Sequence, residues 1–278
     1  MERNTAKRTL EKLLSVCICL CMLGAMLPAQ VFAEEADTAQ TETVQDTAPK
    51  DTVYLSSADD LIQLAKNCRL DSWSQNRTVV LEADIDLSSV DFNGIPSFGG
   101  TWEGQNHAIT GLSLSQDGSV QGLFRYVQQG ALVRDMTVKG RIKPGGTRAS
   151  VGGIAGSNAG TIENCAFDGV VSGTSQIGGI AGVNTVKGSI NGCTVSGTVY
   201  GSHFVGGVVG QNDGVAANCT NAASVNTTVS QNEVKLNDLT LDNVLKTEKA
   251  NDVTDAGGIA GNNAGVLRAC INLSLIHI

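Results

Sequence analysis

One phrase recurs four times in the second half of the sequence and limits the folds that this chain can adopt. It reads VGGIAGSNAG at 151–160, IGGIAGVNTV at 177–186, VGGVVGQNDG at 205–214 and AGGIAGNNAG at 256–265. A weaker unit, containing GLFRYVQQGALVRDMTV, begins near Val120. Successive starts of the four strong units are 26, 28 and 51 residues apart. A period in the twenties indicates a stack of small, similar units.

The residues of each unit select among the repeat architectures. Leucine-rich repeats need a leucine framework, and helical repeats need longer units of good helix formers, whereas these units are rich in Gly, Val, Ile, Ala, Ser and Thr. Each unit offers about three short apolar runs separated by Gly or Asn, which fits one triangular coil of a parallel β-helix. Neighbouring coils would then stack ~4.8 Å apart. A flatter, two-sided solenoid fits the spacing less well and remains an alternative.

Stacking in register places equivalent residues of successive units in columns. The apolar column Ile154, Ile180, Val208 and Ile259 is expected in the core, and a column of asparagines is expected to bond along the stack through its amides. Glycine would supply positive φ or close packing at the corners. The repeat positions are Gly156, Gly182, Gly210, Gly261, Asn158, Asn184, Asn212, Asn263, Cys165, Cys193, Cys219 and Cys270.

The cysteines test this arrangement. Cys165, Cys193, Cys219 and Cys270 would point the same way from neighbouring coils, which leaves their Cβ atoms farther apart than a disulfide prefers. With Cys68, five cysteines follow the first 33 residues, and an odd number argues against a complete disulfide framework. We therefore expect free, buried thiols. Zinc is the alternative, but ligands in a straight line do not converge tetrahedrally.

The N-terminal residues predict export. Four basic residues precede an uncharged run at 13–27 that ends near VFA, so 1–33 is interpreted as a signal peptide and Glu34 as the first mature residue. Residues 34–51 are interpreted as a disordered acidic linker. Removal of the signal leaves 15 Lys and Arg against 25 Asp and Glu, a net charge of about −10. This charge argues against nucleic acid or an anionic membrane as a partner, and no membrane span is expected after cleavage.

Residues 52–119 are interpreted as an N-terminal cap followed by the first coils. Ser57 and Asp60 form a capping pattern for a short helix whose buried face holds Leu61, Ile62, Leu64 and Ala65. Alternation from Val79 to Leu87 then predicts one strand with a single buried face. Short strands separated by Gly follow in 91–115.

The longest spacing in the repeat array indicates an insertion at 229–255. It holds nine charged residues, whereas 151–228 holds four. Insertions in solenoids leave the stack at a corner, so we interpret this segment as a surface loop, with a specific binding element as the alternative.

These units resemble GLUG repeats, which occur in large exported and surface proteins of bacteria. The likeness rests on VGGIAGSNAGTIENCAFDGVVSG and IGGIAGVNTVKGSINGCTVSGTV, and it extends to the preceding segment that ends in GLFRYV, covering about residues 53–272. The resemblance implies surface display, adhesion, or a stalk ahead of other domains. In some relatives such repeats precede a zinc peptidase that cleaves immunoglobulin, but this chain contains no HExxH motif. The family has no agreed catalytic residues.

Catalysis by this chain is the alternative to a binding or stalk function. Asp84 and Asp86 occupy alternate positions of the predicted strand, with Asp91 nearby, and paired carboxylates bind Ca²⁺ or act as acid and base. A polysaccharide lyase would also need a basic residue, for which Arg77 is the candidate. Solvated acids on a half-exposed strand are the simpler interpretation. We expect no catalytic set, metal or cofactor in these residues.

The other polar and aromatic candidates are isolated in the sequence. His107 and His203 lie at predicted turns, with no partner that the sequence identifies. A sugar-binding platform is one interpretation of five aromatic residues, but with an aromatic content of 4% core or cap packing is the simpler interpretation for them: Trp73, Trp102, Tyr54, Tyr126 and Tyr200.

The last residues do not continue the repeat. LSLIHI at 273–278 is the translation of a common transposon-end adapter, so we expect the natural sequence to end near Asn272 and give His277 no role.

The sequence therefore predicts an all-β protein, a right-handed parallel β-helix with a short N-terminal capping helix. The repeats occupy 120–272. The predicted function is that of a non-catalytic, secreted bacterial surface protein, acting as an adhesion surface or a stalk, with a host or bacterial surface protein or glycan as partner. The alternative is the N-terminal solenoid of a larger zinc peptidase or polysaccharide-processing enzyme.

Overall fold

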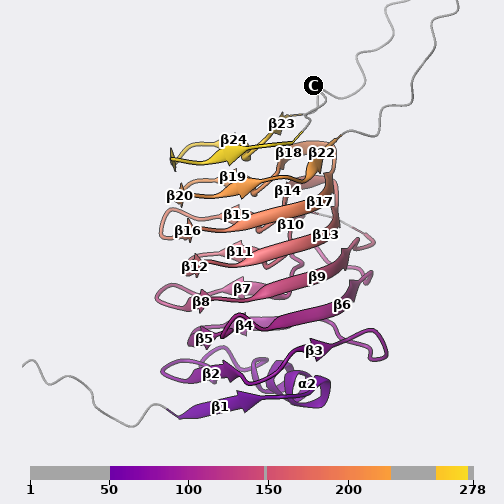
Figure 1. The fold of residues 1–278 in the computed structure, drawn as a ribbon, viewed down its shortest axis with the longest axis vertical. Coiled ribbons are helices and arrows are strands. Elements are labelled where there is room, and N and C mark those ends of the chain that lie inside the picture. The colour runs from indigo at the N-terminus through magenta and orange to yellow at the C-terminus, as the bar shows by residue number, and fades with distance from the viewer. Residues whose placement is uncertain (1–50, 147–148, 227–254, 275–278) are drawn as a thin grey trace, which may run out of the picture. The chain divides into compact units, whose positions relative to one another are not determined.

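The computed structural model describes residues 51–146, 149–226 and 255–274. The expected signal peptide at 1–33, nearly all of the linker at 34–51, most of the insert at 229–255 and most of the adapter-derived end lie outside these residues. The described strands stack in four parallel sheets, which we call A to D. Figure 1 shows the strands rising in layers from β1 beside α2 to β23 and β24.

Sheets A and B each contain eight strands. Sheet A is formed by β1 (Thr52–Leu55), β2 (Thr78–Leu81), β5 (Thr101–Glu103), β8 (Leu132–Arg134), β12 (Thr161–Glu163), β16 (Ser189–Asn191), β20 (Val215–Ala217) and β25 (Val266–Arg268). Sheet B is formed by β3 (Ile85–Asp86), β6 (Ala108–Leu114), β9 (Thr137–Ile142), β13 (Ala166–Ser172), β17 (Thr194–Tyr200), β21 (Thr220–Asn221), β22 (Ser224–Val225) and β26 (Ile271–Asn272).

Sheets C and D complete the coils. Sheet C is formed by β4 (Ile95–Phe98), β7 (Phe124–Val127), β11 (Ala155–Asn158), β15 (Ala181–Asn184), β19 (Val209–Asn212) and β24 (Ala260–Asn263). Sheet D is formed by β10 (Ala149–Gly152), β14 (Ser175–Gly178), β18 (His203–Gly206) and β23 (Ala256–Gly257). A complete coil thus runs through sheets D, C, A and B in turn, as β10 to β13 do.

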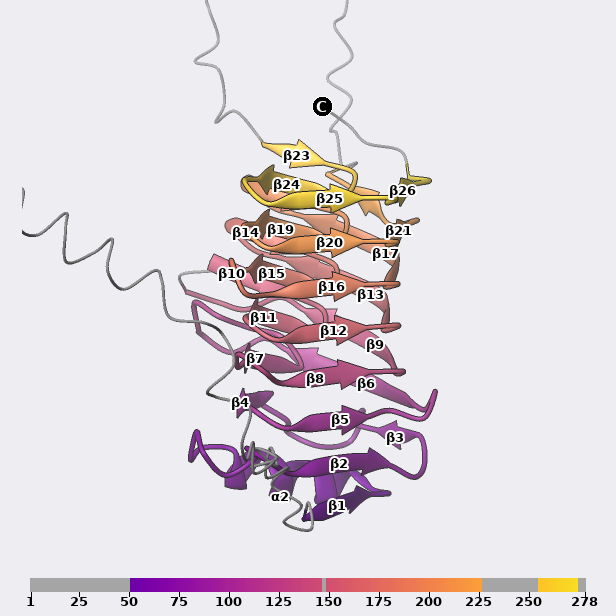
Figure 2. The same ribbon diagram turned by 90° about the vertical axis from the view of Figure 1, so that its left-hand side faces the viewer.

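The parallel β-helix is confirmed, and it is right-handed. In Figure 2, β8 and β12 run from left to right, towards the face that is in front in Figure 1. On that face, β9 and β13 run from left to right in Figure 1, and each successive coil lies above the one before. Right-handed crossovers are the rule for parallel strands. The coils have four strands where about three were expected, because the run VGGIAGSN turns after Gly152 and divides between β10 and β11.

The capping helix is also confirmed. Helix α2 (Ala58–Asn67) is preceded by its N-cap residue Ser57, whose side chain accepts a hydrogen bond from the backbone N–H of Asp60. The carboxylate of Asp60 accepts in return from the Ser57 hydroxyl, at 2.7 Å, which fixes the first turn. Leu61 and Leu64 are buried against the first coils, and burial of each contributes about 1.5–3 kcal/mol.

The strand expected from Val79 to Leu87 is wrong in one respect. It is two strands, β2 in sheet A and β3 in sheet B, with the chain turning through 82–84 between them. The period of two continues through the corner, so Val79, Leu81 and Ile85 are buried although they belong to different sheets.

A continuous core fills the coils from β1 to β22. The expected apolar column is present: Ile154, Ile180 and Val208 are fully buried, and Ile259 in the last described coil is partly buried. Near the helix-capped end the core is aromatic, with Phe98, Trp102 and Phe124 in mutual contact at centroid distances of 5.2–6.0 Å. No sequence repeat marks the coil of β4 to β6, yet these strands pair with β7 to β9, with one register shift between Ile109 and Leu112 of β6.

Candidate functional site

The asparagine column forms the expected ladder at the corner between sheets C and A. Nδ2 of Asn158 donates to Oδ1 of Asn184, Nδ2 of Asn184 donates to Oδ1 of Asn212, and Nδ2 of Asn212 donates to Oδ1 of Asn263, at 2.7–2.8 Å. The first three side chains are fully buried, whereas Asn263 is exposed. Each buried amide also donates to backbone carbonyls of its own corner. The ladder therefore satisfies buried polar groups and stabilises the stack.

The glycine column allows close approach between coils and does not require positive φ. A Cβ on Gly182 would lie 2.4 Å from the carbonyl carbon of Ser150, and on Gly210 it would lie 2.3 Å from that of Gln176. Ser150 and Gln176 themselves adopt positive φ, 54° and 55°. Ser150 and Gln176 occupy equivalent positions of successive coils and form a second column, which is defined by backbone conformation. The sequence does not reveal this column, because its members have different side chains.

The cysteine column lies at the corner before sheet B. The five described cysteines are free; Cys68, Cys165, Cys193 and Cys219 are buried, and Cys270 is partly buried. Burial raises the pKa of Cys165 to about 12 and that of Cys68 to about 11. A hydrogen bond between Cys193 and Cys219 raises the pKa of the first thiol and lowers that of the second. These thiols pack as small core residues.

The acidic candidates do not form one cluster. Asp84, in the corner before β3, accepts hydrogen bonds from the backbone N–H of Ala108 at 2.8 Å and lies 3.1 Å from Nδ1 of His107. Asp86 accepts from the backbone and hydroxyl of Ser88, both at 2.9 Å. In each case a backbone hydrogen bond is the main cause that lowers the carboxyl pKa. Both acids are exposed and held by separate partners.

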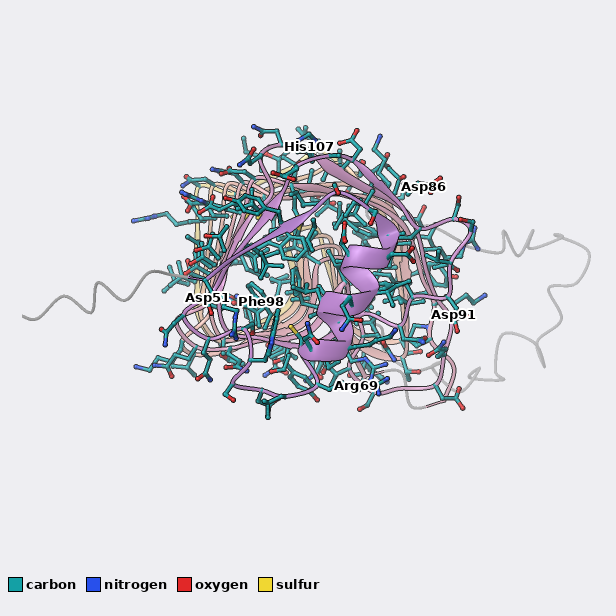
Figure 3. All side chains as sticks on the ribbon, turned by 90° about the horizontal axis from the view of Figure 1, so that it is seen from below. Asp51, Arg69, Asp86, Asp91, Phe98 and His107 are labelled. Carbon is teal, nitrogen blue, oxygen red and sulfur yellow. The ribbon has the colours of Figure 1, made fainter. Side chains whose placement is uncertain are left out.

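Asp91 lies elsewhere. Figure 3 looks onto the helix-capped end and shows Asp91 at the right-hand edge, between Asp86 and Arg69, whereas His107 lies at the top. The side chain of Asp91 accepts from Nε2 of Gln116 at 3.3 Å. Among the described residues, no group of three or more His, Cys, Asp or Glu side chains is placed to hold a metal ion.

The basic candidate for a lyase mechanism is occupied elsewhere. Arg77 pairs with Asp51, with Nη2 3.3 Å from Oδ2, donates to the carbonyl of Trp73 and stacks 4.7 Å above the ring of that residue. The structure does not bring it to Asp84 or Asp86. His203 lies 3.7 Å from Asp255 and belongs to another coil.

The aromatic residues do not share a face. Trp102 is fully buried in the core, and Trp73 is covered by Arg77. Tyr54, Tyr126 and Tyr200 come from β1, β7 and β17, and hence from three different sheets. The interpretation of these five residues as a single sugar-binding platform is therefore wrong.

A polar row that the sequence analysis missed lies on the surface beside the cysteine column. Nδ2 of Asn218 donates to Oδ1 of Asn191 at 2.8 Å, and Nδ2 of Asn191 donates to Glu163 at 3.4 Å. Glu103 and Arg134 form a bidentate ion pair in the coils below, at 2.7 and 2.9 Å. The sequence signal for this row is a polar residue one or two positions before the Cys, which is the Glu of TIENC and the Asn of SINGC and VAANC.

Comparisons with known proteins show the fold and little more. No family model matches the chain. Halomucin of Haloquadratum walsbyi is 29% identical over 128 residues, a match that covers 40% of this chain and 1% of halomucin. The chain therefore spans about one hundredth of that relative.

Among solved structures, a candidate immunoglobulin A1 protease from Bacteroides ovatus is similar, with a TM-score of 0.50 and 18% identity. The match covers 81% of this chain and 76% of that one. The likeness confirms a β-solenoid shared with a bacterial protein. In the described part of this chain, no helix has the length and apolar character needed to cross a membrane.

Proposed function

We propose that this chain is a non-catalytic, exported repeat protein of the GLUG type, whose solenoid acts as an adhesion surface or as a stalk at the bacterial surface. The support is the contrast between the two sides of its strands. In sheet B the inward residues Val138, Phe167 and Val195 are all buried and apolar. Their outward neighbours in register, Lys139, Asp168 and Ser196, differ in charge from coil to coil.

This pattern fits a rigid scaffold. The inward columns repeat because each coil must bury the same shape against the next, whereas the outward columns vary without disturbing the stack. The acids, histidines and Arg77 form separate local pairs on that surface, which supports a role in display over one in catalysis.

Face-specific variants test the adhesion arm of this proposal. Asp168→Lys with Ser196→Lys changes sheet B, and Val183→Lys with Gln211→Lys changes the outward side of sheet C. Binding of the full chain to a panel of glycans and surface proteins is compared for both variants. An adhesion surface loses its partner with one pair and keeps it with the other. A stalk binds nothing on the panel through either face.

A second candidate is the solenoid of a larger surface enzyme, favoured by the likeness in fold to the B. ovatus protein. Incubation of the full chain with immunoglobulin and with acidic and neutral polysaccharides tests for activity in these residues. Turnover that disappears in an Asp84→Asn, Asp86→Asn double variant would overturn the non-catalytic assignment. Absence of turnover in both proteins agrees with it.

A further inference from the structure

A small cavity lies beside the capping helix, between the last turns of α2 and the segment that leads into β4. Its volume is about 240 Å³. Apolar side chains of the helix and of the entering segment form part of its wall, among them Ile62, Phe92 and Pro96. Lys66, Arg69 and Arg125 line the same cavity, together with Asp91. The cavity lies at the helix-capped end of the solenoid, and of its lining residues only Arg125 comes from a repeat unit, the weak one that begins near Val120.

The charge of the cavity is opposite to that of the protein. Three cationic side chains face one carboxylate, in a chain whose formal net charge is −8. Lys66 and Arg69 are exposed, and neither side chain forms an ion pair or hydrogen bond with any residue that the structure describes. The carboxylate of Asp91 is engaged by Gln116 at 3.3 Å. A ligand that binds Lys66 or Arg69 would therefore not have to displace any described protein group from these side chains.

Arg125 provides the stronger argument, because its charge is partly removed from water. This residue of β7 is half-buried, and its Nη2 donates to the backbone carbonyl of Asn93 at 3.2 Å. Its Nε is buried and has no hydrogen-bond partner among the residues that the structure describes. A guanidinium group carries five N–H donors, and a buried donor without a partner is unfavourable. An anion beside this group would offset the cost of its burial.

We propose that this cavity binds one acidic sugar unit through a carboxylate or sulfate group. The cations would hold the anionic group, with Arg125 as the preoriented fork and Lys66 and Arg69 as mobile charges at the rim. The apolar wall offers a surface for the C–H face of a sugar ring, and the volume admits a ligand no larger than about one ring. Neither adhesion nor a stalk function is required for this site, so its failure would leave the proposed function untouched.

The test is a titration of the full chain with four small probes, followed by calorimetry or by NMR chemical shifts. Glucuronic acid carries a carboxylate, glucose 6-sulfate carries a sulfate, glucose carries no charge, and inorganic phosphate is an anion without a ring. We expect saturable binding of at least one of the two acidic sugars, weakened by added salt, and no binding of glucose. Comparison of glucuronic acid with glucose 6-sulfate identifies the anionic group.

Matched variants assign the binding to the cavity. Arg69→Gln and Lys66→Gln are each expected to weaken the acidic sugar about tenfold, the effect of losing one charge-assisted contact. Lys139→Gln removes an equally exposed charge from β9 and is expected to change nothing. Asp91→Asn removes the one acid among the described lining residues and is expected to tighten binding about threefold. Because Lys66 and Arg69 are exposed, their variants retain the fold, which far-UV circular dichroism checks.

Several outcomes would overturn the proposal. Binding of glucose as tightly as glucuronic acid would remove the role of charge, and binding of inorganic phosphate alone would remove the role of the ring. Equal losses in Lys139→Gln and Arg69→Gln would show a general effect of net charge. Absence of binding for both acidic sugars at millimolar concentration would also exclude the site.

Discussion

Replacement of Asn184 by alanine tests whether the asparagine ladder holds the coils together. Asn184 lies in the middle of the ladder, fully buried, with a ladder neighbour on each side. In Asn184→Ala, Oδ1 of Asn212 loses its donor, and Nδ2 of Asn158 loses one acceptor while keeping the carbonyls of Gly160 and Ser189.

The magnitude follows from counting which groups lose their partners. A buried acceptor left without a donor costs about 1–3 kcal/mol, and loss of the second ladder bond costs about 1 kcal/mol more. The carbonyls of Gly188 and Val215 also lose the Asn184 amide, but that of Gly188 still accepts from the backbone N–H of Val215 at 3.0 Å. We therefore expect the free energy of unfolding to fall by about 2–4 kcal/mol, and the Tm by roughly 10 °C.

Asn263→Ala is the matched control, because it removes the same amide from the exposed end of the ladder. Asn263 accepts from Nδ2 of Asn212 at 2.7 Å, and that amide keeps the carbonyls of Gly214 and Val266 as acceptors. Its loss should cost less than about 1 kcal/mol. Urea denaturation followed by circular dichroism compares both variants with the wild type. Equal destabilisation by the two substitutions would refute the role of the buried ladder.

Asn184→Asp adds a pH signature to the same test. The new carboxylate would face Oδ1 of Asn212 without a donor between them, so burial and the missing donor raise its pKa above the unfolded value of about 3.9. A group with a raised folded pKa binds its proton more tightly in the folded state. The difference in stability from the wild type should therefore be smallest below about pH 4 and should grow as the pH rises through the folded pKa. A difference that does not change with pH would contradict this account.

Three further predictions follow from the other columns and the Asp84 pair. Gly182→Ala should destabilise the protein by about 1–3 kcal/mol or more, because the new Cβ would clash with Ser150. In Gly130→Ala a Cβ meets nothing within 4 Å, so this variant should cost only the ~1–2 kcal/mol of its positive φ. Thermal unfolding compares the two variants. In native-state thiol labelling, the partly buried Cys270 should react before Cys165, whose pKa burial raises to about 12; simultaneous labelling would show that the coils open together. The carboxyl of Asp84 should titrate by NMR below 3.8, so its stabilisation is present above the unfolded pKa and is lost as the pH falls through the folded value; a midpoint that does not rise in His107→Ala would exclude the contribution of His107.

The repeat columns could be predicted from the sequence because stacking converts sequence period directly into contact. Asn158 and Asn184 share an offset in two units and therefore lie in register one coil apart. The offset of Gly182 predicts that a side chain larger than hydrogen does not fit there. The sequence does not predict which group excludes it, which the structure shows to be the backbone of Ser150 in its left-handed conformation.

The candidate sites could not be predicted in the same way because they lie where the repeat is weak. Alternation of apolar and polar residues continues through a corner between two strands. The sequence therefore predicts Asp84 and Asp86 on one strand, although the chain turns before β3 and Asp84 lies in that turn. The cavity beside α2 combines residues from three separate segments, at 62–69, 91–96 and Arg125. Only Arg125 lies in a repeat unit, the weak GLFRYV one, and the folding of the cap onto β4 and β7 brings the charges of the three segments together.

The core columns and the residues around the cap differ in how freely they can change, and this difference indicates where specificity in such a chain is located. Each inward column is fixed by the coil above and below it, as the burial of Val138, Phe167 and Val195 shows, so a change there costs stability before it changes binding. Arg69 lies outside the repeats and Arg125 belongs to the weakest unit, and both hold charges that the described protein does not neutralise. A stack can therefore keep its core constant while its cap and outward columns acquire ligands independently.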